Sequence, residues 1–347
     1  MAENYYPFPA KYALTKIDLE GNFISTHCEV LDSFKQYFPY FQFIVSEDSG
    51  YVFTCVKGET VWETGFLIKL DKSGNLVFAR EFTDTLNNPI ALMNVFEIDS
   101  GYLILGNINI GQRIDLLLIR TDYLGNEKWR KLIDPTQSKH YVRGFFKLNN
   151  GNFLISTDNA NIVLHQEVSS TIFIEINTNG NVINKWTDNS KNTYGAKGYF
   201  QTENNDAIYC GSWIDTTWKD GVSLPEYYVF KRGYIVKEDS LHNKVWELRL
   251  GQSSTIPDLF QLKILSDNNF MAVGGTYDST YTDGQPYKNT GWLIKFDIDG
   301  NIIWQRKYFN TEDYPGQTNY LYDFVELPNK DIIAAGERID WVNDYPQ

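Results

Sequence analysis

Residues 115–132 read DLLLIRTDYLGNEKWRKL, and the centre of this stretch is a tight-turn signature of the form Asp-x-x-Gly-Asn. An apolar run precedes the signature and a large aromatic residue, Trp129, follows it. The Asp side chain can cap such a turn, Gly supplies a positive φ, and the aromatic ring closes the returning strand. The stretch therefore predicts a β-hairpin.

The same turn, called here the first-type turn, recurs along the whole chain. Its six copies begin at Asp18, Asp71, Asp122, Asn177, Asp239 and Asp297. The copy at Asp239 has His242 where the other copies have Gly, so we expect a slightly strained left-handed residue there. Regular recurrence of one hairpin signature is typical of repeat architectures.

A second-type turn, of the form Asp/Asn-x-Gly/Asn/Asp followed by an apolar residue, alternates with the first. Its six copies begin at Asp48, Asp99, Asn150, Asn204, Asp267 and Asn329. Two hairpins in each period of roughly fifty residues make four short antiparallel strands, which is the size of one propeller blade. The sequence predicts an all-β fold, a six-bladed β-propeller, with the tight turns on one face and the long connections on the other.

The expected blades follow from the positions of the turns. They cover approximately residues 38–83, 90–132, 141–187, 197–249, 258–308, and 319–337 together with 10–26. The last blade combines hairpins from both chain ends, because the chain opens with a first-type turn and closes with a second-type turn. Such closure would leave no exposed sheet edge. Residues 1–347 are thus predicted to form a single domain.

The composition narrows the class of partner. Lys and Arg number 31 against 44 Asp and Glu, and the net charge of −13 disfavours nucleic acid or an anionic membrane as the main partner. No apolar run approaches the ~20 residues of a transmembrane segment. The three cysteines, Cys28, Cys55 and Cys210, lie far apart without a CxxC spacing. We expect buried free thiols rather than a disulfide framework or a zinc site.

No catalytic or metal-binding motif is visible. The four histidines are scattered, and neither a Gly-x-Ser-x-Gly sequence nor a phosphate-binding loop occurs. The run Asp297-x-Asp299-x-Asn301 lacks the Gly and Glu that complete an EF-hand, so we expect turn capping. The sequence therefore predicts no cofactor, no metal site and no catalytic residue. Carboxylates from different blades could still form a glycosidase pair, because that geometry is invisible in sequence.

Aromatic residues gather in the long connections, such as 211–228 and 276–291, on the face where recognition usually occurs. Flat rings next to carboxylates suit the stacking of sugars or the anchoring of a peptide. The alternative is that these rings pack the loops onto themselves. The candidate ligand-binding residues are Trp213, Trp218, Asp220, Tyr277, Tyr281, Asp283, Tyr287, Tyr314 and Trp341.

The blade text GYLILGN (101–107) with DLLLIRTDYLGNEKWRKL, echoed by GWLIKFDIDGNIIWQRKY (291–308), resembles a repeat of surface and secreted β-propeller proteins of Bacteroidota. The resemblance covers almost the whole chain. It implies a lipoprotein, outer-membrane or exported protein with a binding or scaffold role. Quinoprotein repeats fit less well because Thr-Gly is absent, and sialidase repeats because the Asp, Gly and Trp spacing differs.

These observations favour a non-catalytic binding or scaffold module of a bacterial cell-surface or envelope assembly, which recognises a protein or a glycan through its long-loop face. The alternative is a glycan-active enzyme, a hydrolase or lyase, with two carboxylates about 5–10 Å apart in a central pocket. A cytoplasmic location is a second possibility, because the opening residues MAENYYPFPA lack an export signal. The sequence indicates no oligomeric state.

Overall fold

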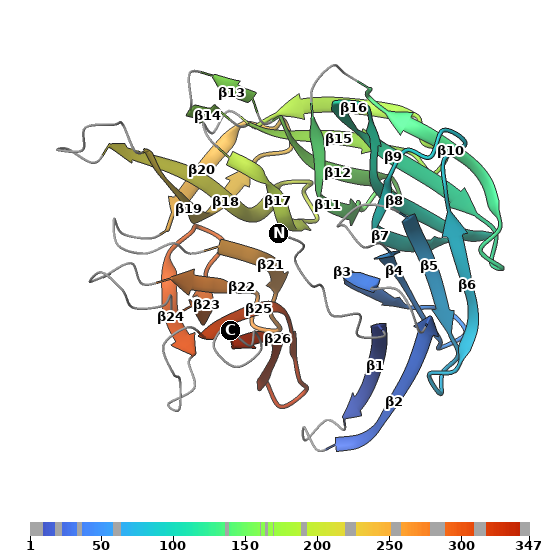
Figure 1. Ribbon diagram of the computed structural model, residues 1–347. Helices are drawn as coiled ribbons and strands as arrows, with labels where there is room; N and C mark the ends of the chain where they lie inside the picture. Colours follow the sequence, from blue (N-terminus) through green and yellow to red (C-terminus); the bar gives the residue numbers. More distant parts are fainter. Residues whose placement is uncertain are drawn as a thin grey trace, which may run out of the picture. The chain divides into compact units, whose positions relative to one another are not determined.

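The computed structural model is built from β-strands (Figure 1). It describes the backbone of residues 10–17, 23–32, 37–57, 64–135, 139–159, 161–163, 166–168, 170–188, 193–218, 227–250, 258–277, 289–308 and 317–340. Side chains are described over 43–56, 64–135, 139–158, 170–188, 193–213, 232–250, 258–275, 291–308 and 320–336. Within these ranges, no helix has the length and apolar character needed to cross a membrane.

The strands are short and follow one another as hairpins. They are β1 (Ala10–Ile17), β2 (Phe23–Asp32), β3 (Tyr37–Val45), β4 (Tyr51–Lys57), β5 (Thr64–Leu70), β6 (Leu76–Phe82), β7 (Ile90–Ile98), β8 (Gly101–Ile110), β9 (Arg113–Thr121), β10 (Glu127–Ile133), β11 (His140–Lys147), β12 (Phe153–Asn159), β13 (Asn161–Val163), β14 (Gln166–Val168), β15 (Thr171–Ile176), β16 (Val182–Thr187), β17 (Thr193–Gln201), β18 (Ala207–Trp218), β19 (Tyr227–Glu238), β20 (Lys244–Arg249), β21 (Asp258–Ile264), β22 (Phe270–Tyr277), β23 (Asn289–Phe296), β24 (Ile302–Tyr308), β25 (Gln317–Glu326) and β26 (Ile332–Asp340).

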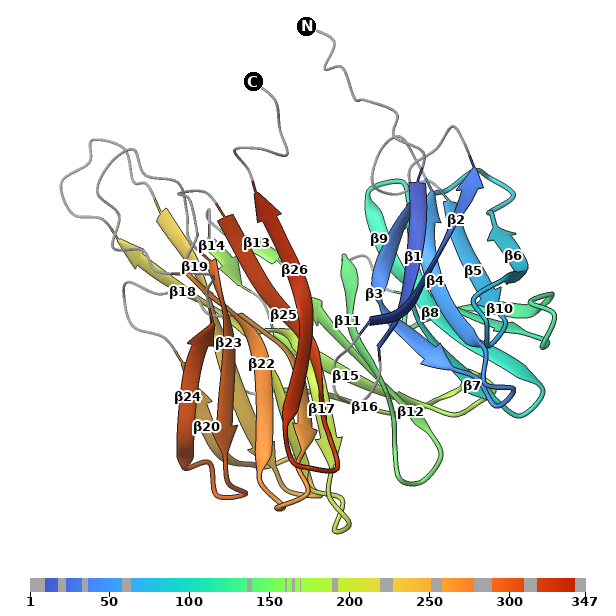
Figure 2. The ribbon, with the colours of Figure 1, turned by 90° about the horizontal axis from the view of Figure 1, so that it is seen from below.

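Four-stranded sheets dominate the fold. They have the orders β3-β4-β5-β6, β7-β8-β9-β10, β11-β12-β15-β16 and β17-β18-β19-β20. Strands β21 to β24 pair in the same way, and β25 and β26 lie beside them (Figure 2), joined through one parallel residue pair, Asn289 with Thr318. The expectation of an all-β fold with four-stranded antiparallel sheets is confirmed.

The closing blade is not seen among the described strands. Strands β1 and β2 form a two-stranded sheet of their own, and β26 ends the sheet that contains β21 to β25. The six-bladed count, the shared blade and the single-domain organisation therefore stay predictions.

Contacts divide the chain into two compact units. Unit 1 is Met1–Phe145 with Ile176–Val182, and unit 2 is Phe146–Glu175 with Ile183–Gln347. The core of unit 1 lies between β3–β6 and β7–β10, where Leu67, Ile90 and Ile104 are fully buried. In unit 2, one core lies between β17–β20 and β21–β24, around Ile235 and Phe270. Each core packs the apolar faces of successive sheets against each other.

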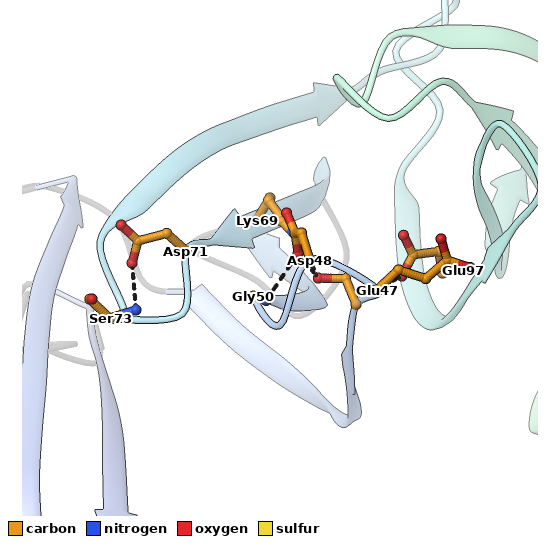
Figure 3. Close-up of polar contacts among 8 residues, drawn as sticks. Glu47, Asp48, Gly50, Lys69, Asp71, Ser73 and Glu97 are labelled. Carbon is orange, nitrogen blue, oxygen red and sulfur yellow. Dashed lines mark hydrogen bonds and ion pairs between the residues drawn. The ribbon is translucent and has the colours of Figure 1, made fainter.

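The first-type turns have the chemistry that the sequence predicts. Asp71 Oδ1 accepts a hydrogen bond from the backbone N–H of Ser73 at 2.8 Å (Figure 3). It accepts a second one from the backbone N–H of Asn75 at 2.9 Å. Asp297 caps its own turn in the same way, as the sequence predicts. Gly74 has a φ of 91°, and His242 has a φ of 63°, so the left-handed position is confirmed in both.

These turns also join neighbouring sheets. The left-handed residue of a turn lies against the aromatic residue on the outer strand of the preceding sheet. The pairs are Gly125 with Phe78, Gly180 with Trp129, His242 with Trp186, and Gly300 with Trp246. A Cβ added to Gly125 would lie 2.7 Å from the Phe78 ring. Glycine is therefore needed here for close approach as well as for its φ angle.

The connection expected at 211–228 is mostly strand, so this boundary was wrong. Strand β18 continues to Trp218 and β19 begins at Tyr227, and these two residues face each other in the ladder. The β-branched and aromatic residues of this stretch favour extended backbone, which lengthens the hairpin. The connection itself is confined to residues 219–226, outside the described part of the chain.

Candidate functional site

The structure describes the side chain of one predicted ligand-binding residue, Trp213. Trp218 and Tyr277 are the last residues of β18 and β22, and their side chains lie outside the described residues. The other candidates also lie outside the described residues: Asp220, Tyr281, Asp283, Tyr287, Tyr314 and Trp341. Recognition by rings on the long-loop face therefore stays a prediction.

Trp213 is a half-buried residue of a strand. Its ring packs against the core that contains Tyr209 and Tyr234. The guanidinium carbons of Arg249 and Arg232 lie 4.5 and 6.0 Å from its ring centroid. Cation–π attraction and apolar contact together fix this ring within the sheet. These contacts are of the kind that the packing alternative describes, and a ligand-binding role of Trp213 stays a prediction.

An ion pair connects β17 and β21 in unit 2. Lys197 Nζ lies 2.9 Å from each carboxylate oxygen of Asp258, and the buried hydroxyl of Ser212 donates to the same carboxylate. Ser212 precedes Trp213 on β18, so its side chain points to the opposite face of the sheet. Asp258 is thus held as a charged structural partner.

Aromatic rings continue from this ion pair onto β25. The Lys197 ammonium lies 4.4 Å from the centroid of the Phe260 ring. The Phe260 centroid lies 5.8 Å from that of Tyr320 and 5.0 Å from that of Tyr322. All three rings are half-buried. Strands β17, β21 and β25 are therefore linked by charge and ring contacts.

Asp258 and Asp323 do not form a glycosidase pair. On β25, Asp323 Oδ1 lies 2.5 Å from Lys263 Nζ. Lys263 is five residues along β21 from Asp258, which places the two positions roughly 17 Å apart at about 3.3 Å per residue. The two carboxyl groups of a glycosidase lie about 5–9.5 Å apart. Asp258 and Asp323 therefore cannot share one glycosidic bond.

A pocket of about 360 Å³ opens in unit 1 at the short-turn ends of β3–β6 and β7–β10. Phe78 and Tyr102 are buried in its wall, and the edge of Tyr102 meets Tyr123 at a centroid distance of 6.1 Å. Tyr123 and Leu124 are 44% and 63% exposed. The pocket thus combines a buried apolar wall with exposed apolar side chains of one turn.

One side of this pocket carries a fixed ion pair (Figure 3). Lys69 Nζ lies 2.5 Å from Asp48 Oδ1, and it also donates to the hydroxyl of Ser46. The hydrogen bond from Lys69 lowers the pKa of Asp48 to about 2. Because the two charges are satisfied by each other, neither is available to balance a further group.

The other side of the pocket carries two carboxylates. The backbone N–H of Glu47 donates to Glu97 Oε2 at 2.9 Å, and Figure 3 shows these two residues next to each other. Among the described residues, no lysine or arginine forms an ion pair with either carboxylate. The buried hydroxyl of Tyr102 lies near Glu97, and burial raises its pKa, so it keeps its proton. The pocket therefore holds two negative charges that its own cation does not balance.

No sequence motif points to this pocket. Glu47 and Glu97 are fifty residues apart, and only the stacking of two sheets brings them together. One signal was available in the turn tips. Tyr123 and Leu124 are both large and apolar, whereas the corresponding tip at Asp71 has Lys72 and Ser73. Two adjacent exposed apolar residues make this turn tip more apolar than the one at Asp71.

A buried carboxylate lies elsewhere, in unit 2. Glu238 is the last residue of β19, and Tyr209 donates its hydroxyl hydrogen to Glu238 Oε1 at 2.8 Å. Burial raises the pKa of Glu238 to about 7. Burial also raises the thiol pKa of Cys55 and Cys210 to about 12, and both are free, as expected. Among the described residues, no cluster of His, Cys, Asp and Glu could hold a metal ion.

No protein-family model matches the chain, and no curated protein matches it. Solved structures are similar to it at low identity. A thermostable family-43 glycoside hydrolase is 10% identical with a TM-score of 0.43, over 80% of this chain and 94% of that one. A luciferin-regenerating enzyme is 12% identical with a TM-score of 0.42, over 81% of this chain and 77% of that one. An endo-arabinase from Bacteroides thetaiotaomicron is 10% identical with a TM-score of 0.39, over 88% and 93%.

Glycoside hydrolases and related enzymes recur among these similar structures. Their TM-scores are 0.43 or lower and their identities 12% or lower. Similarity at this level does not transfer an activity to the present chain, because one fold carries many unrelated functions.

Proposed function

We propose that this protein is a non-catalytic binding module and that the acidic pocket of unit 1 receives a lysine or arginine side chain of a protein partner. One observation carries the proposal: Glu47 and Glu97 lie beside an apolar wall, and no described cation balances them. The aliphatic stem of the incoming residue would lie against Tyr123 and Leu124. Its charged head would meet the two carboxylates.

The size and charge of the pocket support this ligand. Its volume of about 360 Å³ falls within the range of about 300–1,000 Å³ that is usual for small-ligand sites. The net charge of −13 would attract a basic segment during approach. An arginine fork can bind a carboxylate through two parallel hydrogen bonds, so we expect arginine to bind more tightly than lysine.

The wider setting belongs to the same proposal. A six-bladed ring with a shared closing blade would present the pocket at its tight-turn face. The resemblance to Bacteroidota repeat propellers supports a place on a cell surface or in an envelope assembly, where the module would act as a scaffold. A second binding area on the long-loop face, through the residues predicted above, is compatible with this role.

A glycan-active enzyme is the second candidate, because two carboxylates share the pocket. A glycosidase needs one carboxylic acid that stays protonated in apolar surroundings. Glu47 is an exposed residue of a turn, and Glu97 accepts a hydrogen bond from the backbone N–H of Glu47. This arrangement favours charge recognition over general acid catalysis.

Titration calorimetry with a short glycine-flanked arginine peptide tests the proposal. We expect Glu47→Gln with Glu97→Gln to weaken binding at least ~10-fold, as loss of charged hydrogen bonds commonly does. Glu81→Gln is the matched control, because Glu81 is exposed on β6 outside the pocket. A second peptide, in which uncharged citrulline replaces arginine, should bind weakly. Equal affinity for both peptides, or hydrolysis of a nitrophenyl glycoside that Glu97→Gln abolishes, would overturn the proposal.

A further inference from the structure

We infer that the pocket of unit 1 takes a trimethylammonium group, the head of a trimethylated lysine, in preference to an unmodified ammonium group. This inference rests on the proposed function and narrows the lysine side chain named there. Three aromatic rings and two carboxylates line the pocket: Phe78, Tyr102, Tyr123, Glu47 and Glu97. A cation next to aromatic rings is attracted by their quadrupoles, and aromatic cages bind quaternary ammonium ligands in this way.

The pocket offers few hydrogen-bond acceptors to an unmodified ammonium group, which carries three N–H donors. Asp48 Oδ1 already accepts hydrogen bonds from the Ser46 hydroxyl at 2.6 Å and from the Gly50 N–H at 2.9 Å. Glu97 Oε2 accepts one from the N–H of Glu47. A donor that leaves water without finding an acceptor weakens binding. A trimethylammonium group has no N–H, so it avoids this loss.

The negative charge of the pocket acts on its aromatic wall. The pKa of Tyr102 is raised, first by burial and next by the charge of Glu97. The same charge would stabilise a cation close to this ring. Coulomb attraction needs no hydrogen bond, and it is stronger where water is partly excluded. The methyl groups of a trimethylammonium ion can therefore contact Val77 and Leu124, which also line the pocket, while its charge is balanced.

Tyr123 is the ring of this pocket that the repeated fold does not require. It is the second residue of its turn signature, where the six first-type turns have Leu19, Lys72, Tyr123, Thr178, Ser240 and Ile298. Its hydroxyl accepts a hydrogen bond from the Ser100 N–H at 3.3 Å. Its ring lies at 87° to the ring of Tyr102. Tyr123 is thus held at both ends and is still exposed to a ligand.

A trimethylammonium group occurs both on methylated lysine and in choline lipids. The pocket favours the protein source, because a choline head group carries a phosphate close to its ammonium group. That phosphate would lie near Glu47 and Glu97, in a chain with a net charge of −13. Like charges repel, so phosphocholine should bind weakly. The stem of a methylated lysine is uncharged and can lie along the apolar wall.

Titration calorimetry of the full-length chain with four probes tests the inference. Three probes are glycine-flanked peptides that contain lysine, trimethyllysine, or the neutral analogue of trimethyllysine with carbon in place of the charged nitrogen. The fourth probe is phosphocholine. We expect the trimethyllysine peptide to bind at least ~10-fold more tightly than each of the other three probes.

The other outcomes separate this inference from the proposed function. Equal affinity for lysine and trimethyllysine, with both weakened by Glu47→Gln with Glu97→Gln, would overturn the inference and leave the proposed function standing. Equal affinity for the neutral analogue would overturn both, because charge would then play no part. Tighter binding of phosphocholine would overturn the protein source. No binding of any peptide, the arginine peptide included, would overturn both proposals.

Variants of Tyr123 test the ring itself. Tyr123→Leu removes the ring and keeps an apolar side chain, so the trimethyllysine peptide should bind this variant only as tightly as the lysine peptide does. Tyr123→Phe should keep the preference for trimethyllysine. Tyr308→Leu is the matched control, because Tyr308 is a similarly exposed tyrosine on β24 in unit 2. An unchanged preference in Tyr123→Leu would contradict the role of this ring.

Discussion

The imidazole of His242 lies flat against the indole of Trp186, with ring centroids 3.7 Å apart and an angle of 19° between the planes. His242 also has a φ of 63°, in a region that costs a residue with a Cβ roughly 1–2 kcal/mol. Three other turns place a glycine at this position, against the ring of the preceding sheet. The stack offsets the backbone cost, which explains how histidine replaces glycine here.

Substitutions at position 242 separate the two effects. His242→Ala loses the stack and keeps the left-handed strain, so it should lower the free energy of unfolding by ~1–1.5 kcal/mol. His242→Gly loses the same stack but removes the strain, so it should cost about 1 kcal/mol less than alanine. Urea unfolding measures both. If His242→Ala and His242→Gly lose the same free energy of unfolding, the backbone at this position is unstrained.

Gly125 offers a test of the contact between sheets. A Cβ at this position would meet the Phe78 ring at 2.7 Å, whereas Gly151, with a similar φ of 82°, has nothing within 4 Å. Gly151→Ala should therefore cost only the backbone strain, about 1 kcal/mol, and Gly125→Ala about 2 kcal/mol or more. The difference between their unfolding free energies measures the close approach. If the two variants lose the same free energy of unfolding, the turn at Gly125 does not hold the sheets together.

Glu238 should make stability depend on pH near neutrality. Its pKa in the folded state is about 7, above the unfolded value near 4.3. Between these values the folded state binds a proton that the unfolded state lacks, so stability falls as pH rises from about 4.5 to 7. Glu238→Gln keeps an acceptor for Tyr209 and should flatten this slope. At pH 8, Glu238→Gln should raise the free energy of unfolding by on the order of 3 kcal/mol at most.

Thermal unfolding at pH 5 and pH 8 checks this expectation. The variant and the wild type should melt at similar temperatures at pH 5, and the variant should melt higher at pH 8. Glu81→Gln, an exposed carboxylate on β6, is the control. A variant that is less stable at pH 8 would mean that the ionised carboxylate is favourable where it lies.

The sequence predicted the local chemistry better than the contacts between sheets. Capping by Asp71 and the left-handed angle of Gly74 depend on residues within one turn, so their types suffice to predict them. The close approach of Gly125 to Phe78 depends on two sheets, and no local pattern encodes it. The hairpin around Trp218 was misread as a loop because its aromatic residues suit both a binding loop and a strand.

The candidate site shows the same limit. Glu47 lies in the turn between β3 and β4 and Glu97 lies near the end of β7, so their meeting point follows from how two sheets stack. Trp213 was predicted as a ligand contact from its ring alone. Its two arginine neighbours come from β19 and β20, whose register the sequence did not specify.

The most direct test of the proposed binding site is a photo-cross-linking footprint. An arginine peptide with a photoreactive group next to the arginine would be irradiated with the full-length protein, and the labelled residues identified by mass spectrometry. Val77, Tyr123 and Leu124 line the pocket. The proposal predicts labelling of these three residues, with loss of that labelling in the variant carrying Glu47→Gln and Glu97→Gln. Labelling confined to residues 219–226 or 278–288 would contradict it and place recognition in the long connections.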